Sequence, residues 1–70
     1  MSKVIEVRHI ERHIEFLTEK AEYYNERAES YARQDMEHLA GWYEGRGGAF
    51  MSAAMFLQKD LEIFAEEAAQ

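Results

Sequence analysis

The sequence lacks cysteine and proline, and its four glycines all fall between Gly41 and Gly48. Without cysteine, the chain cannot form a disulfide framework, a cysteine-ligated zinc finger or a thiol nucleophile. It has no apolar run near the roughly 18 residues of a membrane-spanning helix. Its early charges also leave no apolar segment for a secretory leader. We therefore expect a cytoplasmic protein that does not bind a membrane.

Basic side chains are scarce: 8 Lys and Arg face 14 Asp and Glu, which gives a formal net charge of −6. A surface of this sign repels nucleic-acid phosphates, so we expect no direct binding to nucleic acid. Seventy residues, 47% of them hydrophobic, predict one small domain over residues 1–70. A chain this short rarely gains more than about 3–5 kcal/mol from one core unless it is cross-linked, metal-bound or oligomeric.

Apolar residues at alternating spacings of three and four predict two helices, because this spacing places them on one helix face. The first repeat runs through Val7, Ile10, Ile14, Leu17, Ala21, Tyr24, Ala28 and Tyr31, then shifts to Ala32, Met36, Leu39 and Tyr43. The shift avoids Asp35 and His38, two polar residues that the unshifted repeat would place in the seam. We expect this helix to cover residues 3 to about 43.

A second repeat predicts a helix from residue 49 to about 68. It runs through Phe50, Ala54, Leu57, Leu61, Phe64 and Ala68, and is widened by Ala53, Phe56 and Ile63. Because the stripe is wide, we expect this helix to contact more than one neighbour.

The glycines predict the turn between the helices at residues 44–48, since glycine readily adopts the left-handed conformation that ends a helix. The expected fold is therefore all-α, a helical hairpin with a long first arm and a shorter second arm. A break near Asn25 is the alternative, and it would give three short helices in a monomeric bundle. The absence of Gly and Pro before Gly41 favours the continuous helix.

Unequal arms would leave part of the first helix uncovered. At about 1.5 Å per residue, the first helix would be ~60 Å long and the second ~30 Å. The uncovered residues would be Val7, Ile10, Ile14 and Leu17. Large aliphatic side chains are seldom left in water, so we expect a second copy to cover them in a homo-oligomeric helical bundle. A homodimer is the expected form and a higher oligomer is the alternative.

The expected hairpin end gathers candidate binding residues, namely Trp42, Tyr43, Arg46 and Met51. Trp, Tyr and Arg are enriched at protein-binding hot spots, and Met adapts to different partners. Arg46 beside the start of a helix would also suit a small anionic ligand such as a nucleotide, because free backbone N–H groups attract anions. A tight interhelical turn with a solvated Arg46 explains the same residues without any ligand.

Metal binding and catalysis have weaker support. Glu6, His9 and His13 have the spacing of helical-bundle metal ligands. The apolar repeat places His9 on the outward side, however, and the neighbouring Arg8 and Arg12 would repel a cation. We expect no metal and no cofactor. No recognisable nucleophile motif surrounds any serine, so we expect no enzymatic activity.

The sequence thus favours a small, acidic, non-enzymatic interaction protein that acts as a homo-oligomer and binds and modulates, for example inhibits, another macromolecule. A homo-oligomeric binder of a small anionic ligand is the alternative, and a helical-bundle metal protein is a weaker one.

Overall fold

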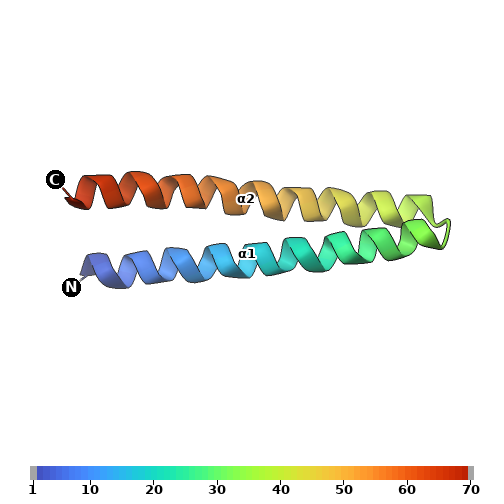
Figure 1. Cartoon of the computed structure of the whole chain (residues 1–70), viewed down its shortest axis with the longest axis horizontal. Helices are drawn as coiled ribbons and strands as arrows, with labels where there is room; N and C mark the ends of the chain where they lie inside the picture. The colour runs from blue at the N-terminus through green and yellow to red at the C-terminus, as the bar shows by residue number, and fades with distance from the viewer. Residues whose placement is uncertain (1, 70) are drawn as a thin grey trace.

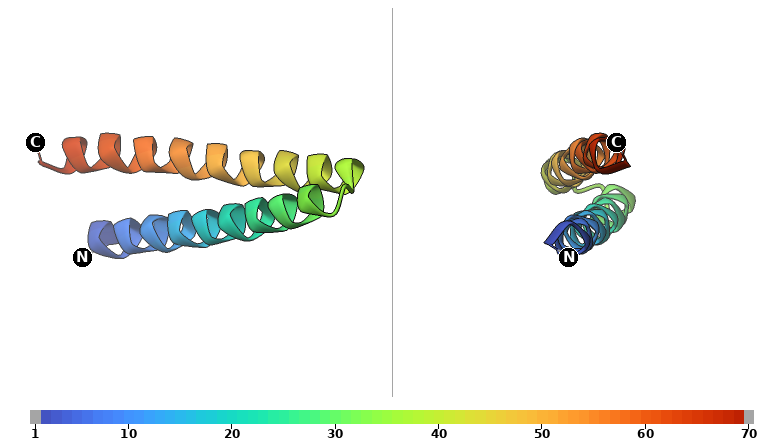
Figure 2. Two further views of the ribbon diagram at one scale, coloured as in Figure 1. Left: turned by 45° about the vertical axis from the view of Figure 1, so that its right-hand side comes forward. Right: turned by 90° about the vertical axis from the view of Figure 1, so that its left-hand side faces the viewer.

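The computed structural model is a hairpin of two antiparallel helices, α1 (Ser2–Arg33) and α2 (Glu37–Ala69) (Figure 1). It describes the backbone of residues 2–69 and the side chains of residues 6–67. Figure 2 shows that the helices lie side by side along their whole length, with both termini at the end opposite the turn. The molecule is a single layer that extends over 53 × 16 × 12 Å between Cα atoms. The prediction of an all-α hairpin is confirmed.

The predicted apolar seams hold the two helices together. All eight residues of the first repeat, from Val7 to Tyr31, are buried or half-buried. The same holds for the second repeat from Phe50 to Phe64, whereas the side chain of Ala68 lies outside those described. Helix α1 continues through Asn25, so the alternative of three short helices is wrong.

The predicted position of the turn is wrong. The chain reverses at residues 34–36, and Gly41, Gly45, Gly47 and Gly48 all lie inside α2 with negative φ. Asp35 has the left-handed conformation instead, with φ of 60°. Aspartate tolerates this region better than most residues because its short polar side chain can hydrogen-bond locally.

Two backbone hydrogen bonds close the end of α1 around Asp35. The N–H of Met36 donates to the carbonyl of Tyr31 at 2.9 Å, and the N–H of Asp35 donates to that of Ala32 at 3.1 Å. This pair of bonds is the Schellman motif, in which the left-handed residue is usually glycine. Helix α2 starts immediately afterwards, since the N–H of Ala40 donates to the carbonyl of Met36 at 2.9 Å.

The new turn position gives the hairpin equal arms, of 32 and 33 residues. The predicted end of the first helix at residue 43 and the predicted start of the second at residue 49 are therefore both wrong. The predicted continuation of the first seam through Ala32, Met36 and Leu39 is also wrong, because these three residues are exposed. Helix α2 lies opposite the first half of α1, and Leu17 is only 8% exposed. The argument that unequal arms leave Val7, Ile10, Ile14 and Leu17 uncovered is consequently wrong.

The core between the two helices is thin. Among residues 6–67, the buried hydrophobic side chains are Leu17, Ala21, Ala28 and Ala54, of which three are alanines. Aromatic rings fill the seam nearer the turn: Tyr24 stacks on Phe50 with 5.5 Å between ring centroids, and Tyr31 stacks on Tyr43 at 5.3 Å. The radius of gyration is 15.9 Å, whereas a compact domain of 70 residues has about 11 Å.

Neither helix, over the part of the chain that the structure describes, combines the length and the apolar character that crossing a membrane would require.

Candidate functional site

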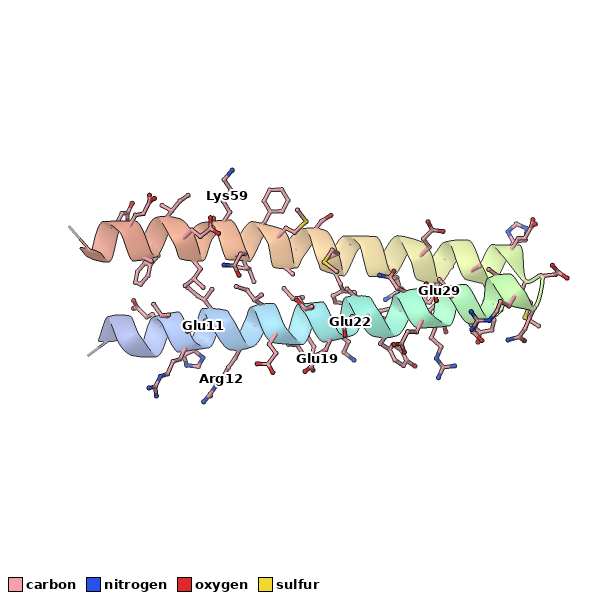
Figure 3. All side chains as sticks on the ribbon, viewed as in Figure 1. Glu11, Arg12, Glu19, Glu22, Glu29 and Lys59 are labelled. Carbon is pink, nitrogen blue, oxygen red and sulfur yellow. The ribbon has the colours of Figure 1, made fainter. Side chains whose placement is uncertain are left out.

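The hairpin has two broad faces, one on either side of the plane through both helix axes. Seam residues occupy every third and fourth position, so the residues on either flank of the seam belong to opposite faces. One face, here called the acidic face, contains Glu11, Glu15, Glu22, Asn25 and Glu29 of α1 and Gly41, Glu44, Gly48, Met51, Met55 and Glu62 of α2. Figure 3 shows Glu11, Glu22 and Glu29 on this face, turned toward the viewer.

The opposite face carries most of the exposed large hydrophobic side chains, and we call it the aromatic–cationic face. It contains Glu6, His9, His13, Phe16, Lys20, Tyr23 and Arg27 of α1 and Leu39, Trp42, Arg46, Ala53, Phe56, Asp60, Ile63 and Glu67 of α2. Phe56 is 72% exposed, Trp42 52% and Phe16 49%. Of the eight exposed large hydrophobics among the described side chains, only Met36 in the turn and Met55 lie outside this face.

Each cation on this face lies over an aromatic ring. The Lys20 ammonium is 5.6 Å from the centroid of Phe16, and the Arg27 guanidinium is 5.2 Å from that of Tyr23. Both pairs are four residues apart, a spacing that brings side chains together on a helix surface. The electrostatic attraction of the Tyr23 hydroxyl raises the pKa of Arg27 above its ordinary value. This face therefore presents aromatic rings with cationic groups stacked over them.

Arg46 is the most constrained of the three cations. Its guanidinium lies 4.3 Å from the ring centroid of Trp42 and 5.9 Å from that of Tyr24 across the seam. Trp42 also packs edge-on against Tyr43, with 4.9 Å between centroids. Trp42, Tyr43 and Arg46, three of the residues predicted for binding, thus form one cluster near the turn.

Two features of the predicted binding site change in the structure. Met51 belongs to the acidic face, so it does not join the other three residues. Gly45–Gly48 lie inside the first half of α2, beyond its first turn, where backbone N–H groups bond to carbonyls of the preceding turn. A start of a helix at this point, the basis for predicting an anion site there, is therefore wrong.

The predicted metal residues lie on the aromatic–cationic face but do not form a cluster. Glu6, His9 and His13 are all exposed. Within the described part of the chain, no group of three or more His, Asp or Glu side chains is placed to hold a metal ion.

The acidic face contains an open groove near the turn, of about 380 Å³, lined by Asn25, Ala28, Glu29, Ala32, Ala40 and Glu44. Its lining confirms which flanks of α1 and α2 meet on this side. Small side chains create the hollow, and two carboxylates border it.

Sequence reasoning did not assign Phe16, Tyr23, Lys20 or Arg27 to a site. The signal was present, because these residues follow the same spacing of three and four as the seam, displaced by one position. Phe56 and Ile63 widen the second apolar stripe of the sequence, and both are exposed in the hairpin. Comparison of the chain with models of protein families, with curated proteins and with solved structures found no match.

Proposed function

We propose that this protein is a non-enzymatic interaction module that assembles with itself through the aromatic–cationic face and, as a homo-oligomer, binds and modulates another macromolecule. The observation that supports this proposal is the concentration of exposed rings and aliphatic side chains on one face of a hairpin whose own core is thin.

Burial of this face in a contact with another protein surface is energetically favourable. Domains are normally built from at least two packed layers, and this hairpin supplies one. Fully burying one large apolar side chain contributes roughly 1.5–3 kcal/mol. The exposed rings therefore offer more stabilisation than the alanines in the seam. Monomeric proteins seldom leave contiguous apolar patches of this kind in water.

Two neighbouring residues provide a matched test of the face. Phe56 and Met55 are 72% and 67% exposed and line one shallow hollow on the outer side of α2 with Ser52 and Lys59, but helical spacing directs Phe56 toward the aromatic–cationic face and Met55 toward the acidic face. We expect Phe56→Ser to weaken self-association by about tenfold or more, because it removes a ring from the contact. Met55→Ser should leave self-association within about twofold of the unsubstituted protein. Light scattering over a concentration series measures both.

Three outcomes would contradict the proposal. A protein that stays monomeric at high micromolar concentration would exclude self-assembly. Equal weakening by both variants would exclude the aromatic–cationic face as the specific contact, and an unchanged Phe56→Ser variant would exclude it as well. Circular dichroism of each variant establishes that helicity is retained, which both positions should allow because both side chains are largely exposed.

A small anionic ligand is the second candidate function, and the three cations over aromatic rings favour it. Arg27 and Arg46 lie in the half of the face nearer the turn, with Lys20 toward its middle, and a phosphate or carboxylate could bind to such planar guanidinium groups. Native mass spectrometry distinguishes the two functions. Whole multiples of the 8.2 kDa chain mass support self-assembly alone, whereas an additional small mass removed by high salt supports an anionic ligand.

A further inference from the structure

We infer that the occupant of the aromatic–cationic face is a second copy of this chain, stacked in the antiparallel sense so that the two turns lie at opposite ends of a four-helix assembly. This inference deepens the proposed function and depends on it, because it specifies the partner and its orientation.

Charge is distributed unevenly along the face. The half nearer the turn carries Arg27 and Arg46, with Lys20 toward the middle. Among the described side chains, 6–67, the half nearer the termini carries Glu6, Asp60 and Glu67, and its other titratable groups are His9 and His13. Arg46 and Asp60 are 14 residues apart on α2, which corresponds to about 21 Å along the axis. One half of the face is thus basic and the other acidic.

This distribution selects one of the two twofold arrangements available to stacked hairpins. If both turns lay at the same end, basic would face basic and acidic would face acidic, and like charges brought together across an interface cost binding energy. If the turns lie at opposite ends, each basic half faces the partner's acidic half. Each attractive pairing of charges then occurs twice, because a twofold axis repeats every contact across the interface.

The apolar side chains fit the same arrangement. Phe16 and Phe56 lie near the middle of the hairpin, so each ring meets the middle of the partner in an antiparallel stack. Trp42, near the turn, comes opposite the partner's Ile63, which is near the termini. Both are exposed in the isolated hairpin.

The face is comparable in extent to a standard dimer interface. Its Cα atoms span 53 by 16 Å, a footprint of the same order as the roughly 800 Å² of accessible surface that each partner buries in such an interface. Stacking through the opposite face would instead bring Glu11, Glu15, Glu22 and Glu29 of two copies together. The aromatic–cationic contact leaves these carboxylates in solvent.

A charge-exchange cycle tests the orientation. Arg27→Glu with Arg46→Glu makes both halves of the face acidic, and Asp60→Lys with Glu67→Lys makes both basic. We expect each double variant to associate about tenfold or more weakly than the unsubstituted protein. The quadruple variant exchanges the two halves and keeps the net charge, so we expect it to recover most of the lost affinity. Sedimentation equilibrium provides the dissociation constants.

Arg12→Glu with Arg33→Glu is the matched control, because it makes the same change in net charge outside the broad faces; Figure 3 shows Arg12 on the outer edge of α1. We expect this control to weaken association by less than about threefold. The antiparallel inference would be overturned if the double variants associated as tightly as the unsubstituted protein. It would also be overturned if the control variant lost as much affinity as the Arg27 and Arg46 double variant, or if the quadruple variant recovered none of the lost affinity. In those cases, self-association of the unsubstituted protein would leave the proposed function standing. A monomeric unsubstituted protein would overturn both.

Discussion

Asp35 lies where the chain reverses, between the end of α1 and the start of α2. Its φ of 60° lies in the left-handed region, where a side chain costs energy that glycine avoids. The Schellman hydrogen bonds around it hold the last turn of α1 closed and place Met36 directly at the start of α2. A residue with high helix propensity at this position would favour continuing the helix over reversing it.

Asp35→Gly is expected to stabilise the hairpin by about 0.5–1 kcal/mol, because glycine removes the strain of the left-handed conformation. For a chain of this size that raises the Tm by about 2–8 °C. Thermal unfolding followed by circular dichroism measures the change. Asp35→Asn is the control for charge and should change the Tm little. A lower Tm for Asp35→Gly would show that the aspartate side chain, and not the backbone conformation, stabilises the turn.

At the scale of the element, α2 is unusual in containing four glycines within its first half. A glycine inside a helix costs roughly 0.5–1 kcal/mol relative to alanine. A Cβ added at Gly41, Gly45 or Gly48 would meet no atom within 4 Å. At Gly47, which is buried against α1, it would collide with the Oδ1 atom of Asn25 and lie 3.4 Å from the carbonyl oxygen of Ala21. Gly47 therefore has a packing role that the other three lack.

These environments predict different effects of alanine. Gly45→Ala should raise the free energy of unfolding by about 0.5–1 kcal/mol. Gly47→Ala should stabilise less, or destabilise, because the Asn25 side chain must move. In an Asn25→Ala background the two substitutions should become nearly equivalent, which a double-mutant cycle by urea unfolding would reveal. An equal gain at both positions in the natural background would contradict the close approach of Gly47 to Asn25.

Periodicity and turn chemistry differed in how well they could be read from the sequence. The two seams were predictable residue by residue, because burial of Ile10, Leu17 or Leu57 follows from helical spacing alone. The turn was not, because glycine is the usual signal for a helix end and all four glycines lie inside α2. Helical packing tolerates glycine inside α2, whereas an aspartate ended α1. The unshifted repeat reached two polar residues at Asp35 and His38, and this was the signal that the helix had already ended.

The candidate site followed the same pattern. Trp42 and Arg46 were selected from their residue types, and the structure places them together on one face. Phe16 and Tyr23 could not be assigned to that face until the second helix was paired with the first. The position of the turn decides which residues of the two helices lie on the same face of a hairpin. A wrongly predicted turn therefore assigns exposed residues to the wrong face.

At the scale of the whole molecule, the hairpin is one layer with chemically different sides. A thin, alanine-rich seam holds the two helices, the acidic face suits solvent, and the aromatic–cationic face is suited to a second layer. Self-assembly would therefore complete the fold, because the assembled form would contain the larger apolar core. Stability is then expected to rise with protein concentration, since association stabilises the folded state by mass action.

The fluorescence of Trp42 tests this account most directly, because it is the one tryptophan of the chain and lies on the aromatic–cationic face, 52% exposed in the isolated hairpin. We predict that its emission shifts to shorter wavelength as concentration rises, in parallel with the increase in mass seen by light scattering, and that Phe56→Ser moves both transitions to higher concentration. An emission maximum that stays at the wavelength of a water-exposed indole while the mass doubles would contradict the account, because the chain would then assemble through another surface.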